Sequence, residues 1–291
     1  MPFPYLAETK KLDDSLRQRA EGDFVLLPDG YTHYELVGNE NAETVVLVHG
    51  FSVPYFIWEP TFRALSDAGY RVLRYDLFGR GFSDRPKARY DLAFFSRQLR
   101  NLLDALHITQ AINLCGLSMG GAITATFTAK YPERVKKLAL FDPAGGAATP
   151  RPFSFKLIQI PGLGELLIGL FGEPILLKAM AADLYDPELV ADFLSKYRPQ
   201  MAYQGFKRAI LSTMRHDALG DSSRTYAQVG ELGIPTLLIW GREDTTVPYD
   251  QAEGLVASLK GVRFHTIEGS GHIPHYEKAD EVNPILLDFL H

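Results

Sequence analysis

The chain has 291 residues, 46% of them hydrophobic, which is enough to bury the core of one large domain with an insertion or of two domains. Its formal net charge of −5 at pH 7 provides no basic surface for nucleic acid, so we expect no nucleic-acid partner. The single cysteine, Cys115, excludes an internal disulfide and is typical of a protein from a reducing compartment.

The N-terminal region carries no targeting or membrane signal. Roughly the first twenty residues contain charged side chains throughout and lack the apolar stretch of a secretory signal. No apolar run elsewhere reaches the roughly twenty residues needed to cross a bilayer. We therefore expect a cytoplasmic protein without a membrane span.

From residue 23 onwards, the chain alternates between predicted strands and helices. A turn at Pro28-Asp29-Gly30 joins runs 24–27 and 31–37 into a hairpin. Later strands, most of them apolar on both faces, are predicted at 44–48, 72–75, 112–115, 138–141, 236–240 and 263–267. Helices are predicted at 55–68, 92–106, 122–131, 250–259 and 281–290. This alternation predicts an α/β fold with a mostly parallel central sheet flanked by helices on both faces.

A candidate nucleophile follows the strand at 112–115. The segment Gly116-Leu117-Ser118-Met119-Gly120 matches the nucleophile-elbow pattern G-x-S-x-G, in which a strand turns sharply into a helix. Small residues are needed at Gly116 and Gly120, because side chains there would collide with neighbouring elements. We expect the Ser118 hydroxyl to project from the turn, with the positive end of the following helix behind it.

Two further loops follow strands at the same edge of the sheet. His49-Gly50-Phe51-Ser52 could supply the Phe51 N–H, which together with the Met119 N–H would bind an oxyanion, while His49 more plausibly fastens its loop. The loop from Asp76 to Pro86 predicts an ordered turn in which Asp76 holds backbone N–H groups. A phosphate-binding loop is the rival interpretation, but the glycines lack its spacing and its lysine.

Residues 150–224 lose the strand pattern and are rich in apolar and aromatic side chains. At the carboxyl end of the sheet, such a segment predicts a helical lid over a mainly apolar cavity. We therefore assign residues 1–149 and 225–291 to the core and 150–224 to a helical cap.

The last two predicted strands are followed by an acid and a histidine. Asp244 follows the strand at 236–240, and His272 lies in a glycine-rich loop after the strand at 263–267. With Ser118 they complete the chain order serine, aspartate, histidine that is expected after a nucleophile elbow.

Three neighbouring residues offer alternatives. Asp142 also follows a strand and could supply the acid, but Asp244 has the better spacing to the proline that follows it. Glu243 lacks that spacing and is expected to face solvent. His275 could replace His272 as the base, although a residue just past the loop more often fixes the loop's geometry.

The chain from about residue 23 to 291 resembles the α/β-hydrolase family. The matching stretches are Val48 to Phe51, Asp76 to Asp84, Gly116 to Gly121, Gly241 to Pro248 and Gly271 to Glu277. The resemblance implies that Ser118 is the nucleophile, His272 the general base and Asp244 the residue that orients it. It also implies that Phe51 and Met119 donate the oxyanion N–H groups.

Within the family, the chain looks most like lidded serine carboxylesterases. The expected substrate is a small apolar ester of short to medium acyl chain, hydrolysed through an acyl-enzyme and contacted by Phe51, Trp58 and Met119. We expect no metal and no organic cofactor, because no cluster of ligand-type residues suggests one.

Three other functions remain open for the same fold. A perhydrolase is one, and a non-catalytic ligand receptor is another. A carbon–carbon bond hydrolase is the third, although its usual glycine-proline-glycine oxyanion loop is absent, since Phe51-Ser52-Val53-Pro54 follows His49-Gly50. The serine argues against the dehalogenase and epoxide-hydrolase branches, which place aspartate at that position.

Overall fold

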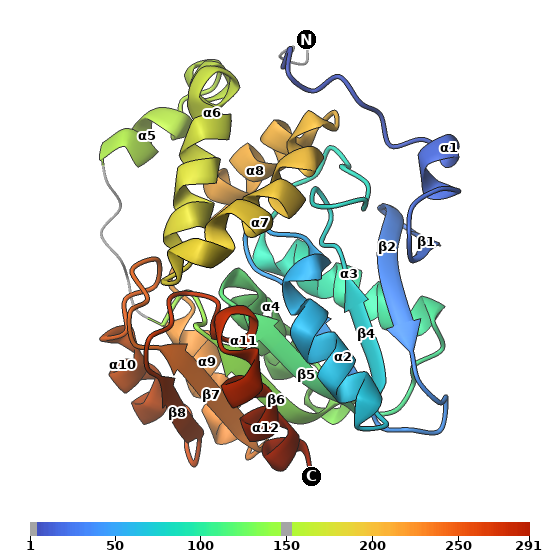
Figure 1. The fold of residues 1–291 in the computed structure, drawn as a ribbon, viewed down its shortest axis with the longest axis vertical. Helices are drawn as coiled ribbons and strands as arrows, with labels where there is room; N and C mark the ends of the chain where they lie inside the picture. Colours follow the sequence, from blue (N-terminus) through green and yellow to red (C-terminus); the bar gives the residue numbers. More distant parts are fainter. Residues whose placement is uncertain (1–4, 147–152) are drawn as a thin grey trace.

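The computed structural model describes residues 5–146 and 153–291, and side chains from residue 155 onwards in the second range. Its centre is an eight-stranded sheet in the order β1-β2-β4-β3-β5-β6-β7-β8 (Figure 1). The strands are β1 (Asp23–Leu27), β2 (Gly30–Val37), β3 (Thr44–Val48), β4 (Arg71–Tyr75), β5 (Ile112–Leu117), β6 (Val135–Phe141), β7 (Thr236–Gly241) and β8 (Arg263–Ile267). The pairs β1–β2 and β2–β4 are antiparallel, and the other neighbours are parallel. The predicted hairpin and mostly parallel sheet are confirmed.

Helices cover both faces of the sheet, as predicted. The helices of the described residues are α1 (Asp14–Arg17), α2 (Glu59–Asp67), α3 (Leu92–Ala105), α4 (Met119–Lys130), α5 (Phe153–Gln159), α6 (Leu163–Ala182), α7 (Pro187–Tyr197), α8 (Phe206–Arg215), α9 (Ser223–Glu231), α10 (Gln251–Ser258), α11 (Pro274–Glu277) and α12 (Ala279–Leu290). Short 3-10 helices lie at Tyr55–Trp58, Pro132–Arg134 and Arg198–Ala202.

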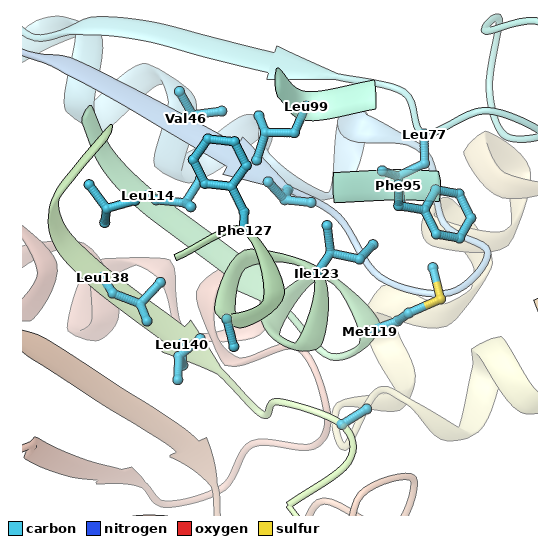
Figure 2. Packing of buried hydrophobic residues seen from close by; sticks show 14 of the residues in the cluster. Val46, Leu77, Phe95, Leu99, Leu114, Met119, Ile123, Phe127, Leu138 and Leu140 are labelled. Carbon is cyan, nitrogen blue, oxygen red and sulfur yellow. The ribbon is translucent and has the colours of Figure 1, made fainter. Parts of the chain in front are cut away.

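The central strands are apolar on both faces because each face packs against a different layer of helices. Along β3, Val46 and Val48 belong to the core that α3, α4, α9 and α10 cover. The alternate residues Val45 and Leu47 belong to the core on the opposite face, under α2 and α12. Figure 2 shows the first of these cores, with Leu114 of β5 beside Phe127 of α4.

The chain between β6 and β7 is helical. Helices α5 to α8 gather at one end of the molecule, away from the C-terminus (Figure 1). Helix α9 instead packs against α4 and α10 at the sheet. The predicted cap boundary at 149–150 lies outside the described residues, and the boundary at 225 falls inside α9. Among residues 5–146 and 153–291, no helix is both long enough and apolar enough to cross a membrane.

We expect Leu140→Ala to lower the free energy of unfolding by about 2–5 kcal/mol, because it opens a cavity in a core that is fully packed. Leu26→Ala is the matched control, since Leu26 is 63% exposed on β1, and its cost should stay below about 1 kcal/mol. Chemical denaturation followed by circular dichroism measures both values. Equal costs for the two variants would contradict the assignment of Leu140 to the core.

Candidate active site

Ser118 occupies a strained turn between β5 and α4. Its φ of 54° lies in the left-handed region, which is unfavourable for a serine. Glycines permit this turn: a Cβ on Gly120 would lie 2.3 Å from the Val48 carbonyl oxygen, and one on Gly116 would lie 2.5 Å from the Gly120 oxygen. The Ser118 N–H donates to the Phe141 carbonyl at 2.9 Å, which ties the turn to the neighbouring strand.

The structure brings Asp244 and His272 together from the loops after β7 and β8. The His272 Nδ1 lies 2.7 Å from Asp244 Oδ2. The other Asp244 oxygen accepts the N–H groups of Thr246 and Val247 at 2.8 and 2.9 Å. Since these donors fix the carboxylate, it can hold the imidazole in one orientation, with Nε2 free to accept a proton.

The environment of His272 favours its charged form. Burial lowers the pKa of the imidazole, but the Asp244 carboxylate, with those of Asp183 and Glu277 behind it, raises the pKa of His272 to about 9. His275, the alternative base, is fully buried, and burial lowers its pKa to about 3. The structure therefore places a readily charged imidazole at His272 and a neutral one at His275.

Ser118 and His272 line one cavity of about 550 Å³. Phe51 contributes to its wall from the β3 loop, and Met180 and Asp183 contribute from the end of α6 and the residue that follows it. The cavity combines a largely apolar wall with a few polar groups, which is typical of a small-molecule site. It lies where the residues after the strands meet the helices inserted between β6 and β7.

Phe51 is held in place by a buried cation. Its carbonyl accepts a hydrogen bond from Arg80 Nε at 2.7 Å, and Arg80 Nη2 reaches Thr213 of α8 at 2.8 Å. The loop that contains Arg80 is itself ordered by Asp76, which accepts the N–H groups of Tyr55 and Phe82, as predicted. This loop therefore links the candidate oxyanion loop to the inserted helices.

The other two predicted substrate contacts lie elsewhere. The Met119 side chain points into the core (Figure 2), so only its N–H, at the first residue of α4, can serve the site. Trp58 does not line the cavity: its ring stacks on His275 with centroids 4.1 Å apart and packs edge-on against Phe141. The sequence alone does not distinguish an aromatic residue that lines the site from one that is buried beneath it, as Trp58 is.

Sequence reasoning missed the contacts that fasten the histidine loop. The carbonyl of Asp183, the residue after α6, accepts the His272 N–H at 2.8 Å. The Glu277 carboxylate accepts the N–H groups of Gly271 and Tyr185 at 2.7 and 2.6 Å. Glu243, expected in solvent, accepts the Ser270 N–H at 3.0 Å. Backbone groups have no sequence signature, so these links could not be read from the chain.

One group of described side chains has the spacing of a metal site. Ligand atoms of Asp142, Asp244 and His272 lie within 4.8 Å of one another. However, Asp244 and His272 are hydrogen-bonded to each other through Oδ2 and Nδ1 at 2.7 Å. The arrangement suits an acid–base pair that transfers a proton better than a cation site.

A family model described as alpha/beta hydrolase fold matches residues 43–279. The chain belongs to the alpha/beta hydrolase fold family. This hydrolase is 32% identical over 274 residues to a 2-hydroxy-6-oxo-6-phenylhexa-2,4-dienoate hydrolase of Comamonas testosteroni, covering 91% of this chain and 92% of the relative. It is also 32% identical to a 2-hydroxy-6-oxononadienedioate/2-hydroxy-6-oxononatrienedioate hydrolase of Paraburkholderia phymatum, covering 94% and 96%.

A solved structure of a meta-cleavage product hydrolase from Pseudomonas fluorescens has the same fold, with a TM-score of 0.75 at 25% identity, covering 92% of this chain and 97% of that one. These comparisons overturn the carboxylesterase prediction. The compounds in the relatives' names contain a ketone and no ester linkage. Of the functions left open by the sequence, the carbon–carbon bond hydrolase agrees with these names.

We expect the reaction of Ser118 with diisopropyl fluorophosphate to accelerate as pH rises, because His272 accepts the serine proton only in its neutral form. Since the pKa of His272 is raised to about 9, the midpoint should lie well above the ordinary value of 6.5. The inactivation rate, measured from about pH 5 to about pH 10, gives this midpoint. A midpoint at or below the ordinary value would contradict the site described here.

Proposed function

We propose that this chain hydrolyses a carbon–carbon bond next to a ketone, in a substrate of the 2-hydroxy-6-oxo-dienoate class. The observation that carries the proposal is the similarity of nearly the whole chain to hydrolases named for such substrates. The cavity that Ser118 and His272 share supports it, because that cavity has the volume of a small-molecule site.

The chemistry of the substrate explains how a serine hydrolase could break such a bond. Moving the proton of the 2-hydroxyl group to the carbon beside the ketone gives a tautomer with two carbonyl groups. When the carbon–carbon bond then breaks, its electron pair is delocalised through the remaining double bond onto the oxygen at the second carbon. The leaving group is therefore a stabilised dienolate, which takes up a proton on that oxygen to give the 2-hydroxydienoate product.

We assign the steps to residues as follows. His272 takes the proton of Ser118 while Oγ bonds to the ketone carbon, and Asp244 stabilises the imidazolium that forms. The N–H groups of Phe51 and Met119 bind the resulting oxyanion. Water then hydrolyses the acyl-enzyme and releases a carboxylic acid.

The helices between β6 and β7 have a role in this proposal. We propose that residues 150–224 form a cap that encloses the substrate, because Met180 and Asp183 contribute to the cavity wall. The described wall is mainly apolar, and Asp183 and Asp221 add carboxylates to it. An apolar acyl group such as phenyl suits this wall better than one that carries a second carboxylate.

The first test is hydrolysis of 2-hydroxy-6-oxo-6-phenylhexa-2,4-dienoate, followed by loss of its conjugated chromophore and by identification of benzoate. We expect Ser118→Ala to lower kcat by on the order of 10⁴-fold, because it removes the nucleophile. Ser52→Ala is the control, since Ser52 also contributes to the cavity wall but has no assigned step. A folded Ser118→Ala protein that retained most of its activity would exclude this mechanism.

The second test addresses the acid. We expect Asp244→Asn to lower kcat by roughly 10³- to 10⁴-fold, because the imidazole loses its orienting carboxylate. Asp142→Asn should cost far less, since Asp142 forms no hydrogen bond with the His272 ring. The two variants are compared in the same assay, and the opposite ranking would move the orienting acid to Asp142.

A further inference from the structure

The carboxyl group of Asp142 is fully buried and only half satisfied. Asp142 follows β6, and its Oδ1 accepts the Gly241 N–H at 2.8 Å. Its Oδ2 is also buried, and no group among the described residues donates a hydrogen bond to it. A buried polar atom without a partner is costly, so Oδ2 requires an explanation.

The nearest candidate partner is another carboxylate. An oxygen of Asp142 lies within 4.8 Å of one from Asp244 and of a ring nitrogen of His272. Asp244 accepts hydrogen bonds from the His272 ring and from two backbone N–H groups, so it is the better stabilised anion. Burial, followed by the Asp244 charge, raises the pKa of Asp142 well above its usual range.

The charges around Asp142 and Asp244 make a second negative charge on this pair unfavourable. The charged or titratable groups that face the pair are His272 from the loop after β8, Glu277 from α11 and Asp183 at the end of α6. Counting Asp244, which adjoins Asp142, three of the four groups around the pair are therefore acids. A single imidazolium cannot balance every one of them in the anionic form.

We propose that Asp142 carries a proton on Oδ2 and donates it in a hydrogen bond to Asp244, which fixes the carboxylate that orients His272. Asp142 is a positioning residue in this arrangement, because it acts through Asp244. The proposal rests on the roles assigned above to Asp244 and His272.

The backbone supports this role. Asp142 has a φ of 42°, and its N–H donates to the Ile239 carbonyl of β7 at 3.0 Å. Two residues later, the Ala144 N–H donates to the Ser118 carbonyl at 3.0 Å. The segment 142–144 therefore connects the acid to the nucleophile turn, and the strained conformation aims the Asp142 side chain at β7 and the loop that follows it.

Two variants separate a proton donor from a second anion. Asp142→Asn retains a neutral donor of the same shape, and asparagine tolerates a left-handed φ. Asp142→Gly removes the side chain without backbone strain. The readout is the pH dependence of the diisopropyl fluorophosphate reaction, in which the Ser118 oxygen bonds to phosphorus and fluoride leaves. This reaction reports on Ser118 and His272 whatever the natural substrate is.

We expect Asp142→Gly to slow the reaction by about 10- to 100-fold, the loss associated with a hydrogen bond to a charged group, and Asp142→Asn to restore it to within about threefold of the unmodified protein. The midpoint of the pH profile should stay within about half a unit in Asp142→Asn. If Asp142 were ionised, removing its charge at this distance would lower the midpoint by more than about one unit. Asp183→Asn is the positive control, because the Asp183 charge raises the pKa of His272 and the amide oxygen can still accept the hydrogen bond from Thr246.

A measurement on the unmodified chain covers the case in which Asp142→Gly fails to fold. With aspartate labelled at the carboxyl carbon, the ¹³C resonance absent from Asp142→Asn identifies Asp142. We expect the chemical shift of a protonated carboxyl group at neutral pH. A carboxylate shift at neutral pH, or an Asp142→Gly protein as reactive as the unmodified one, would overturn the proposal.

Discussion

The site depends on how closely α4 approaches β3 and β5. The Gly120 Cα lies so close to the Val48 carbonyl that any side chain would collide with it, and Gly116 is equally confined by α4. This contact directs the first turn of α4 beneath Ser118 and forces the serine into a left-handed conformation. The positive end of α4 therefore lies beside Ser118 because the backbones are in contact.

A buried set of charges forms the second half of the site. His272 contacts Asp244 directly, while Asp183 and Glu277 act on it from farther away. The same two residues fasten the histidine loop through backbone hydrogen bonds. Electrostatics and loop position are thus supplied by the same residues, and the end of α6 contributes to both. A change in the inserted helices would therefore reach the imidazole as well as the cavity wall.

The same candidate residues fit either an ester or a ketone, which explains why the prediction of a carboxylesterase was wrong. A serine, a histidine and an acid activate a nucleophile, but they do not choose the bond that breaks. That choice depends on whether the leaving group is an alcohol or a stabilised carbanion. The absence of a glycine-proline-glycine loop after His49 favoured the ester over the carbon–carbon bond. Relatives named for dienoates nevertheless match more than nine-tenths of this chain.

The sequence by itself determined the α/β architecture and the candidates for the site. Strands such as β3 (Thr44–Val48) and β8 (Arg263–Ile267) have the predicted bounds, because local apolar patterning specifies them. The candidates Ser118, Asp244 and His272 were visible because each follows a strand in a fixed order. Helix α4 begins at Met119 instead of the predicted residue 122, since the elbow glycines mask its first turn.

Only the tertiary structure decided how these candidates meet. The hydrogen bond between Asp244 and His272, the unpaired Oδ2 of Asp142 and the stacking of Trp58 on His275 all depend on how segments far apart in the sequence meet. Local patterning cannot specify such contacts, because they depend on the register and twist of the whole sheet and on where the inserted helices rest. Burial and hydrogen bonding then set the protonation of each group. Several donors stabilise the ionised form of a carboxyl group, whereas burial with few donors favours its protonated form.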